Sequence, residues 1–180
     1  MSRPVSLVQR GTVKLERLLP GPIERVWAYI TESDKREKWL CAGEFDLRVG
    51  GKVELRFDNA KLSPKEKMPD DECGRHSPKA GVITRLDPPR LLAHTWVWDG
   101  TETDVTYQLA ERGSQVLLTI VHRNLGDSKD LVPRVMGGWD THSGILEDIL
   151  KGVEPRPFWT TWTRAAQEYA QETAPATERG

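Results

Sequence analysis

The 180-residue sequence is short of cysteine, of net charge and of long apolar runs. Its two cysteines, Cys41 and Cys73, form no CxxC pair, so we expect no disulfide framework and favour a reduced, cytoplasmic location. The 26 basic and 27 acidic residues leave a net charge of −1, which argues against a protein built around nucleic-acid phosphates. No apolar run approaches the ~20 residues needed to cross a bilayer, and residues 1–11 lack the apolar core of a signal peptide. These absences predict a cytoplasmic globular protein with no nucleic-acid or membrane partner.

Familiar catalytic and nucleotide-binding motifs are also absent. The chain has no GxSxG nucleophile elbow, no Walker loop and no GxGxxG fingerprint. We therefore assign no catalytic residue, no cofactor and no metal from motifs.

Tryptophan is abundant by comparison. Aromatic residues make up only 7% of the chain, yet seven are Trp, against three Phe and three Tyr. Trp is bulky and carries an N–H group that needs a partner when it is buried. Seven of them in so small a protein indicate either a deep core or a lined cavity.

Apolar periodicity predicts seven strands and four helices. Strands are indicated where apolar and polar residues alternate between Gly and Pro turns, and helices where apolar residues recur every three or four positions. The predicted strands are 12–19, 45–49, 53–57, 80–86, 90–98, 102–110 and 114–123. The predicted helices are 22–30, 33–40, 139–151 and 155–172, with Gly137-Gly138 at the start of the third. The polar segment 58–79 is predicted to be a long loop.

This pattern predicts an α+β fold of the helix-grip kind, in which a curved antiparallel sheet of six or seven strands surrounds a long C-terminal helix. A further helix follows it. We treat 1–180 as a single domain, with a core at 12–151, an appended helix at 155–172 and a tail at 173–180. A sheet wrapped around one helix tends to leave a gap where small molecules bind.

Four segments in order resemble a known family, namely RLLPGPIERVWAYITESDKREKWL, RVGGKVEL, GVITRLDPPRLLAHTW and GGWDTHSGILEDILKG. Together they resemble the SRPBCC (START/Bet v 1-like) superfamily, in the branch related to the C-terminal domain of the activator of Hsp90 ATPase. The resemblance covers about 12–170, and PRPFWTTWTRAAQEY is similar to an extra helix of some bacterial members.

The resemblance implies a ligand-binding or stress-associated protein, because many bacterial members are described in those terms. It leaves two alternatives, an enzyme of the cyclase or hydrolase type and a partner module for Hsp90. In the eukaryotic co-chaperone a separate N-terminal domain makes the main activating contacts, whereas only about 11 residues precede the first predicted strand here. The partner we expect is a hydrophobic small molecule, with a homodimer and an Hsp90 contact as further alternatives.

The predicted strand 90–98 supplies most of the expected cavity lining. Its period of two places Leu92, His94, Trp96 and Trp98 on one face. With inward-facing residues of other elements, the expected ligand-binding set is Trp39, Phe45, Leu55, Phe57, His94, Trp96, Trp98, Tyr107, His122, Trp139, His142 and Leu146. The simpler interpretation is that these rings only fill the core. Trp27 is expected to pack the first helix, and Trp159 and Trp162 to anchor the appended one.

Three histidines are predicted to point inward from two strands and the overlying helix. His94, His122 and His142, with Asp104, are the only candidates for catalysis, and three imidazoles are one known zinc ligand set. However, none is paired at i, i+4 spacing, and His94 and His122 would lie about 10 Å apart across an intervening strand. We therefore expect these rings to hydrogen-bond to a ligand, to buried water or to the backbone.

The loop 58–79 carries one more cluster. Cys73 and His76 stand beside three acidic residues at 70–72, which is a conceivable metal clip with few ligands. A solvated acidic loop, or a lid over the cavity, is the simpler interpretation.

Overall fold

The computed structural model describes residues 4–69, 79–98 and 100–174. Within these ranges seven strands form one antiparallel sheet in the order β1-β2-β7-β6-β5-β4-β3. The strands are β1 Val5–Gln9, β2 Thr12–Pro20, β3 Lys52–Leu55, β4 Lys79–Asp87, β5 Leu91–Trp98, β6 Thr101–Arg112 and β7 Gln115–Arg123. The predicted metal clip of Cys73, His76 and 70–72 lies outside the described residues.

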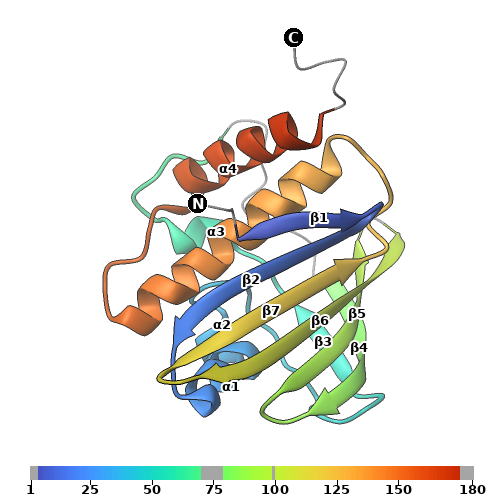
Figure 1. The fold of residues 1–180 in the computed structure, drawn as a ribbon, viewed down its shortest axis with the longest axis vertical. Helices are drawn as coiled ribbons and strands as arrows, with labels where there is room; N and C mark the ends of the chain where they lie inside the picture. Colours follow the sequence, from blue (N-terminus) through green and yellow to red (C-terminus); the bar gives the residue numbers. More distant parts are fainter. Residues whose placement is uncertain (1–3, 70–78, 99, 175–180) are drawn as a thin grey trace.

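The helices gather around one face of this sheet (Figure 1). They are α1 Ile23–Thr31, α2 Ser33–Arg36, the 3-10 helix η1 Asn59–Leu62, α3 Leu131–Lys151 and α4 Phe158–Thr173. The long helix α3 packs against β2 and β1, and α4 lies alongside α3. The α+β helix-grip prediction is confirmed.

Alternation along the central strands builds the core. On β7, Val116, Leu118, Ile120 and His122 are buried, while the residues between them are more exposed. The register continues this pattern across the sheet, because His94 of β5, Val105 of β6 and His122 of β7 lie in one row. This inward face is the one that meets α3.

The number of strands agrees with the prediction, but one of the segments that form them differs. The segment 45–49 is no strand and forms only a bridge between Phe45 and Val53. Its alternation meets the core only at Phe45, because Leu47 and Val49 are exposed. The seventh strand is instead β1, where only Val5 is buried. An edge strand with one buried residue has no alternating pattern to reveal it.

Helix α3 begins at Leu131, about two turns before the predicted start at 139. Gly137 and Gly138 therefore lie inside the helix rather than at its start. A Cβ on Gly137 would lie 2.8 Å from the backbone nitrogen of Ala166 in α4. Glycine at this position lets the two helices approach closely, which is a packing role and not a turn.

A half-buried ion network joins β2, α3 and α4. Arg17 of β2 donates to Glu147 and to Asp140 of α3, each at 2.7 Å. Tyr169 of α4 donates its hydroxyl to the other oxygen of Asp140 at 3.0 Å. The network fixes both C-terminal helices on the sheet, and thereby fixes the position of the space between them.

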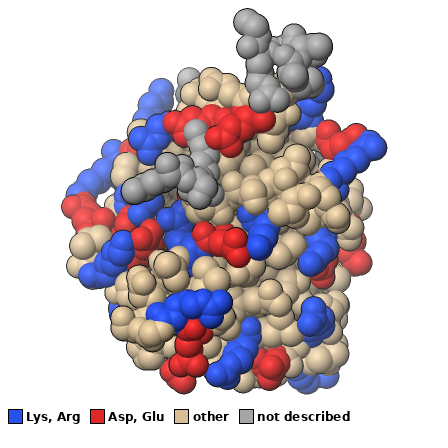
Figure 2. All heavy atoms as spheres, in the orientation of Figure 1, with Lys and Arg blue, Asp and Glu red and all other residues tan. Residues whose placement is uncertain are grey.

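The outer surface is mixed in charge. Figure 2 shows basic and acidic side chains interspersed over the visible face. No helix within the described ranges is long and apolar enough to cross a membrane.

Candidate functional site: an aromatic cavity between the sheet and the C-terminal helices

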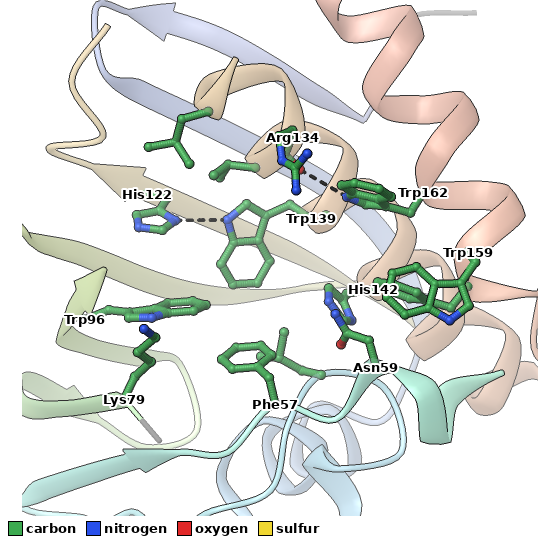
Figure 3. A pocket seen from close by; sticks show the side chains of 15 residues that line it. Phe57, Asn59, Lys79, Trp96, His122, Arg134, Trp139, His142, Trp159 and Trp162 are labelled. Atoms are coloured by element: carbon green, nitrogen blue, oxygen red, sulfur yellow. Dashed lines mark hydrogen bonds between the residues drawn. The ribbon is translucent and has the colours of Figure 1, made fainter. Parts of the chain in front are cut away.

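A cavity of about 380 Å³ lies where α3, α4 and the inward face of the sheet meet (Figure 3). Its lining residues are Leu40, Phe57, Asn59, Lys79, Trp96, His122, Leu131, Arg134, Val135, Gly138, Trp139, His142, Phe158, Trp159 and Trp162. Small-molecule sites in proteins commonly enclose roughly 300–1,000 Å³. The space is therefore large enough for a compact ring compound.

Trp96 forms the centre of the aromatic wall. Its ring stacks on Phe57 with centroids 5.2 Å apart and on His122 at 5.4 Å, and Figure 3 shows these two rings on opposite sides of it. Trp139 of α3 meets Trp96 edge-on at 6.1 Å. Stacked and edge-to-face pairs of this kind hold the rings in fixed orientations.

His122 is locked into one neutral tautomer by a chain of hydrogen bonds. Thr103 donates its hydroxyl to the carbonyl of Trp96 at 2.7 Å, so His122 Nε2 carries a proton and donates to Thr103 Oγ1 at 2.9 Å. His122 Nδ1 then accepts from Trp139 Nε1 at 3.2 Å. Burial, and to a lesser degree His94 nearby, lowers the pKa of His122 to about 3. Both nitrogens are occupied, so this ring is uncharged and has no nitrogen available for proton transfer.

His142 contributes a second neutral imidazole with a different geometry. Its Nδ1 lies 2.6 Å from the carbonyl of Trp39 and must donate to it. Burial lowers the pKa of His142 to about 4, against a smaller opposing effect of that hydrogen bond. In this neutral ring the remaining nitrogen, Nε2, is an acceptor.

Further polar groups come from η1, β4 and α3. Asn59 of η1 and Lys79 of β4 line the cavity, and the Arg134 guanidinium lies 5.0 Å from the Trp162 ring centroid. Two buried atoms, Asn59 Oδ1 and Trp159 Nε1, have no hydrogen-bond partner among the described residues. A ligand or a water molecule could satisfy both, because buried polar atoms are normally paired.

The loop after η1 holds the start of α4 in place. Glu66 accepts from the backbone N–H of Trp159 at 2.8 Å and of Thr160 at 3.1 Å, while Ser63 accepts from that of Phe158. Partial burial works to raise the pKa of Glu66, but hydrogen bonds from Thr160 and Ser63 outweigh it and lower the pKa. This carboxylate caps the helix from a distant segment and so fixes Phe158 and Trp159 at the cavity.

The structure brings five of the twelve predicted residues together around the cavity. These are Phe57, Trp96, His122, Trp139 and His142. Six others are buried in the core and do not line it, namely Trp39, Phe45, Leu55, His94, Tyr107 and Leu146. The side chain of Trp98 lies outside the described residues. Trp39 is held away from the cavity by α1, since its Nε1 donates to the Tyr29 carbonyl at 2.8 Å.

The catalytic set of three histidines and Asp104 does not assemble. Asp104 points to the opposite face of the sheet, where it pairs with Arg123 at 3.4 Å. His94 is fully buried between Phe45 and Tyr107, and β6 separates it from His122. The described residues contain no group of three or more His, Cys, Asp or Glu placed to hold a metal.

Sequence reasoning missed the contribution of α4 and of the first half of α3. Ten lining residues were not predicted, namely Leu40, Asn59, Lys79, Leu131, Arg134, Val135, Gly138, Phe158, Trp159 and Trp162. Trp159 and Trp162 were assigned to anchoring α4, and they also face the cavity. Phe158, Trp159 and Trp162 are three large aromatic residues within five positions. That density is the feature of the sequence that could have indicated a second role for this helix at the cavity.

The sheet gripping α3, with an aromatic cavity between them, defines a helix-grip protein of the SRPBCC type. The family model described as "Activator of Hsp90 ATPase homolog 1-like protein" matches residues 20–151. The chain therefore belongs to this family. The match ends with α3, so the residues of α4 at the cavity lie beyond it.

Solved structures with the same fold cover most of the chain. A protein from Bordetella parapertussis is 36% identical over 97% of this chain and 95% of its own, with a TM-score of 0.78. CalU16 from Micromonospora echinospora is 24% identical over 89% of this chain and 84% of its own, with a TM-score of 0.65. The Aha1 dimer from Colwellia psychrerythraea is 16% identical over 77% of this chain and 95% of its own, with a TM-score of 0.58. The last two show the fold alone, and a comparison with curated proteins finds no match.

Proposed function

We propose that this protein binds a small apolar or aromatic molecule in the cavity between the sheet, α3 and α4. The observation that carries the proposal is a 380 Å³ space walled by Trp96, Trp139, Phe158 and other rings. Buried rings that only filled the core would close on one another. Burying a flat ring against them removes apolar surface from water at about 25 cal/mol per Å².

Gly138 gives this cavity part of its volume. It lies on the face of α3 that lines the space, and a Cβ added there would meet nothing within 4 Å. Glycine in the middle of a helix costs about 0.5–1 kcal/mol relative to alanine. An open glycine at this position is consistent with selection for space rather than for helix stability.

Binding is favoured over catalysis by the state of the histidines. A general base must reach the proton that it abstracts through a free lone pair. His122 has both nitrogens engaged, and His142, whose pKa is lowered to about 4 by burial, donates its Nδ1 proton to the Trp39 carbonyl and not to a carboxylate. These groups fit a role in orienting a bound molecule.

The test uses N-phenyl-1-naphthylamine, a neutral aromatic probe whose fluorescence rises in apolar surroundings. We expect one probe molecule per chain, excited by energy transfer from the cavity tryptophans. Gly138→Leu should weaken binding at least about tenfold by filling the space, since a lost contact of 1.4 kcal/mol already changes affinity tenfold. Gly138→Ala is the matched control and should retain binding.

Thermal unfolding of both variants separates loss of binding from loss of fold. Leucine and alanine are better helix formers than glycine by up to about 1 kcal/mol, so neither variant should melt below the parent protein. Equal probe affinity in the parent and Gly138→Leu, or no binding by the parent, would rule out a ligand in this cavity.

A further inference from the structure

Among the residues that the structure describes, the charged side chains that line the cavity are all of one sign. Lys79 from the start of β4 and Arg134 from the first half of α3 line it. Among the described residues that line it there is no Asp and no Glu. The chain as a whole has 26 basic and 27 acidic residues, so overall composition does not account for this bias. The positive sign is a local property of the cavity.

The two cations and the aromatic rings differ in depth. Lys79 is half-buried and Arg134 is exposed, whereas Trp96, Trp139 and Phe158 are all at least 96% buried. Figure 3 shows Lys79 and Arg134 reaching the ring-lined space from different elements. The charged residues are therefore the more exposed part of the lining, and the aromatic rings are its more deeply buried part. This gradient suits a ligand with a charged group at one end, because a fully buried charge is costly.

The remaining titratable groups of the lining do not alter the sign. His122 and His142 are both neutral near pH 7, because burial depresses the pKa of each. The buried atoms Asn59 Oδ1 and Trp159 Nε1 are polar and uncharged. Among the described lining residues, the Lys79 ammonium and the Arg134 guanidinium are thus the groups that carry charge near pH 7.

We infer that the ligand is an aromatic anion whose rings lie against Trp96 and Trp139 and whose acidic group faces Lys79 and Arg134. The inference rests on the proposed function, since it names the chemical class that the same cavity takes. Arg134 donates through a planar fork and Lys79 acts as a point charge, and both serve carboxylate, sulfonate or phosphate oxygens.

The experiment compares two probes with the same aromatic body. 1-Anilinonaphthalene-8-sulfonate carries a sulfonate, and N-phenyl-1-naphthylamine is the same skeleton without it. An uncharged apolar cavity would prefer the neutral probe, because the sulfonate loses hydration on binding. We expect the parent protein to bind the anionic probe about tenfold more tightly at low salt, since exposed ion pairs contribute up to about fivefold each. The preference should shrink in 0.5 M NaCl as the charges are screened.

Two variants assign the preference to the named residues. Lys79→Met and Arg134→Met keep an unbranched apolar side chain and remove the charge. Each should reduce the preference for the anionic probe about threefold, and the double variant should abolish it while N-phenyl-1-naphthylamine still binds. Lys52→Met is the matched control, because Lys52 is exposed on β3 and does not line the cavity.

The outcomes are distinguishable. Equal affinity for the two probes, or tighter binding of the neutral one, overturns the anion and leaves the proposed function standing. A preference that survives in the double variant also overturns it. Failure of the parent to bind either probe overturns both proposals.

Discussion

Acid should unfold this protein in a pH range set by its buried histidines. The structure describes three, His94, His122 and His142, and burial lowers their pKa values to about 4, 3 and 4 from an ordinary value of 6.5. Below pH 6.5 the unfolded chain takes up protons on these rings, and the folded protein does not. The free energy of unfolding therefore falls as the pH falls through this range.

The magnitude follows from the number of protons. Each histidine contributes about 1.4 kcal/mol per pH unit between its two pKa values, so the three together contribute about 4 kcal/mol per unit. Between pH 6.5 and 4.5 the loss reaches up to about 8 kcal/mol, which matches the whole stability of an ordinary domain, about 5–15 kcal/mol. We expect the protein to unfold before pH 4.

The carboxylates act in a separate range. Burial works to raise the pKa values of Glu66, Glu147 and Asp148, but hydrogen bonds and nearby cations lower all three. Groups with depressed pKa values lose their stabilising effect only below their unfolded values, near pH 4.5 or lower. The interval from pH 6.5 to 4.5 therefore reports on the histidines.

The assay is urea unfolding followed by far-ultraviolet circular dichroism at half-unit steps from pH 7.5 to 4.5. The slope should correspond to about three protons per molecule. His94→Phe should reduce it to about two, because a phenyl ring fits between Phe45 and Tyr107 and loses one hydrogen bond, to Thr95. A free energy that stays constant from pH 6.5 to 5, or an unchanged slope in His94→Phe, would refute the reasoning.

Two further predictions concern the position of α4. Gly137→Ala should lower the melting temperature, at a cost of about 1–3 kcal/mol, because the new Cβ would lie 2.8 Å from the Ala166 backbone nitrogen. Gly138→Ala, which meets nothing within 4 Å, should melt no lower than the parent, and equal losses in both variants would contradict this packing. Glu66→Ala should destabilise the protein by about 1 kcal/mol through loss of the helix cap and increase iodide quenching of Trp159, with Glu66→Gln intermediate. Unchanged quenching would show that the cap does not hold α4.

The central strands and the long helices were predictable because their pattern is local. In β7 the side chains alternate strictly between a buried and a more exposed face, and β5 and β6 depart from this alternation only at the additional buried residues Ala93 and Thr106. A period of two in the sequence therefore predicts both these strands and their inward residues. The register confirms this, since His94 and His122 occupy one inward row across β6. The same reasoning failed at 45–49, where Phe45 is buried but the alternating residues that follow it, Leu47 and Val49, are 44% and 64% exposed.

Two glycines inside α3 led to a predicted helix start that is eight residues too late. Gly137 and Gly138 each weaken a helix locally by up to about 1 kcal/mol, so the sequence favoured a boundary there. Close approach of Ala166 at Gly137 requires the missing side chain, and packing against α4 outweighs the local preference. No local pattern contains that information, because the partner lies in another element.

By itself the sequence determined the α+β fold, the inward face of the central strands, and the presence of an aromatic interior. These follow from short-range periodicity and composition. The tertiary structure decided which rings line a cavity and which fill the core. Trp159 reaches the cavity because Glu66, 93 positions away, caps its helix, and Lys79 and Arg134 share the cavity although they lie on different elements. Contacts between segments so far apart depend on how the elements pack, and the amino-acid sequence of any single segment does not encode them.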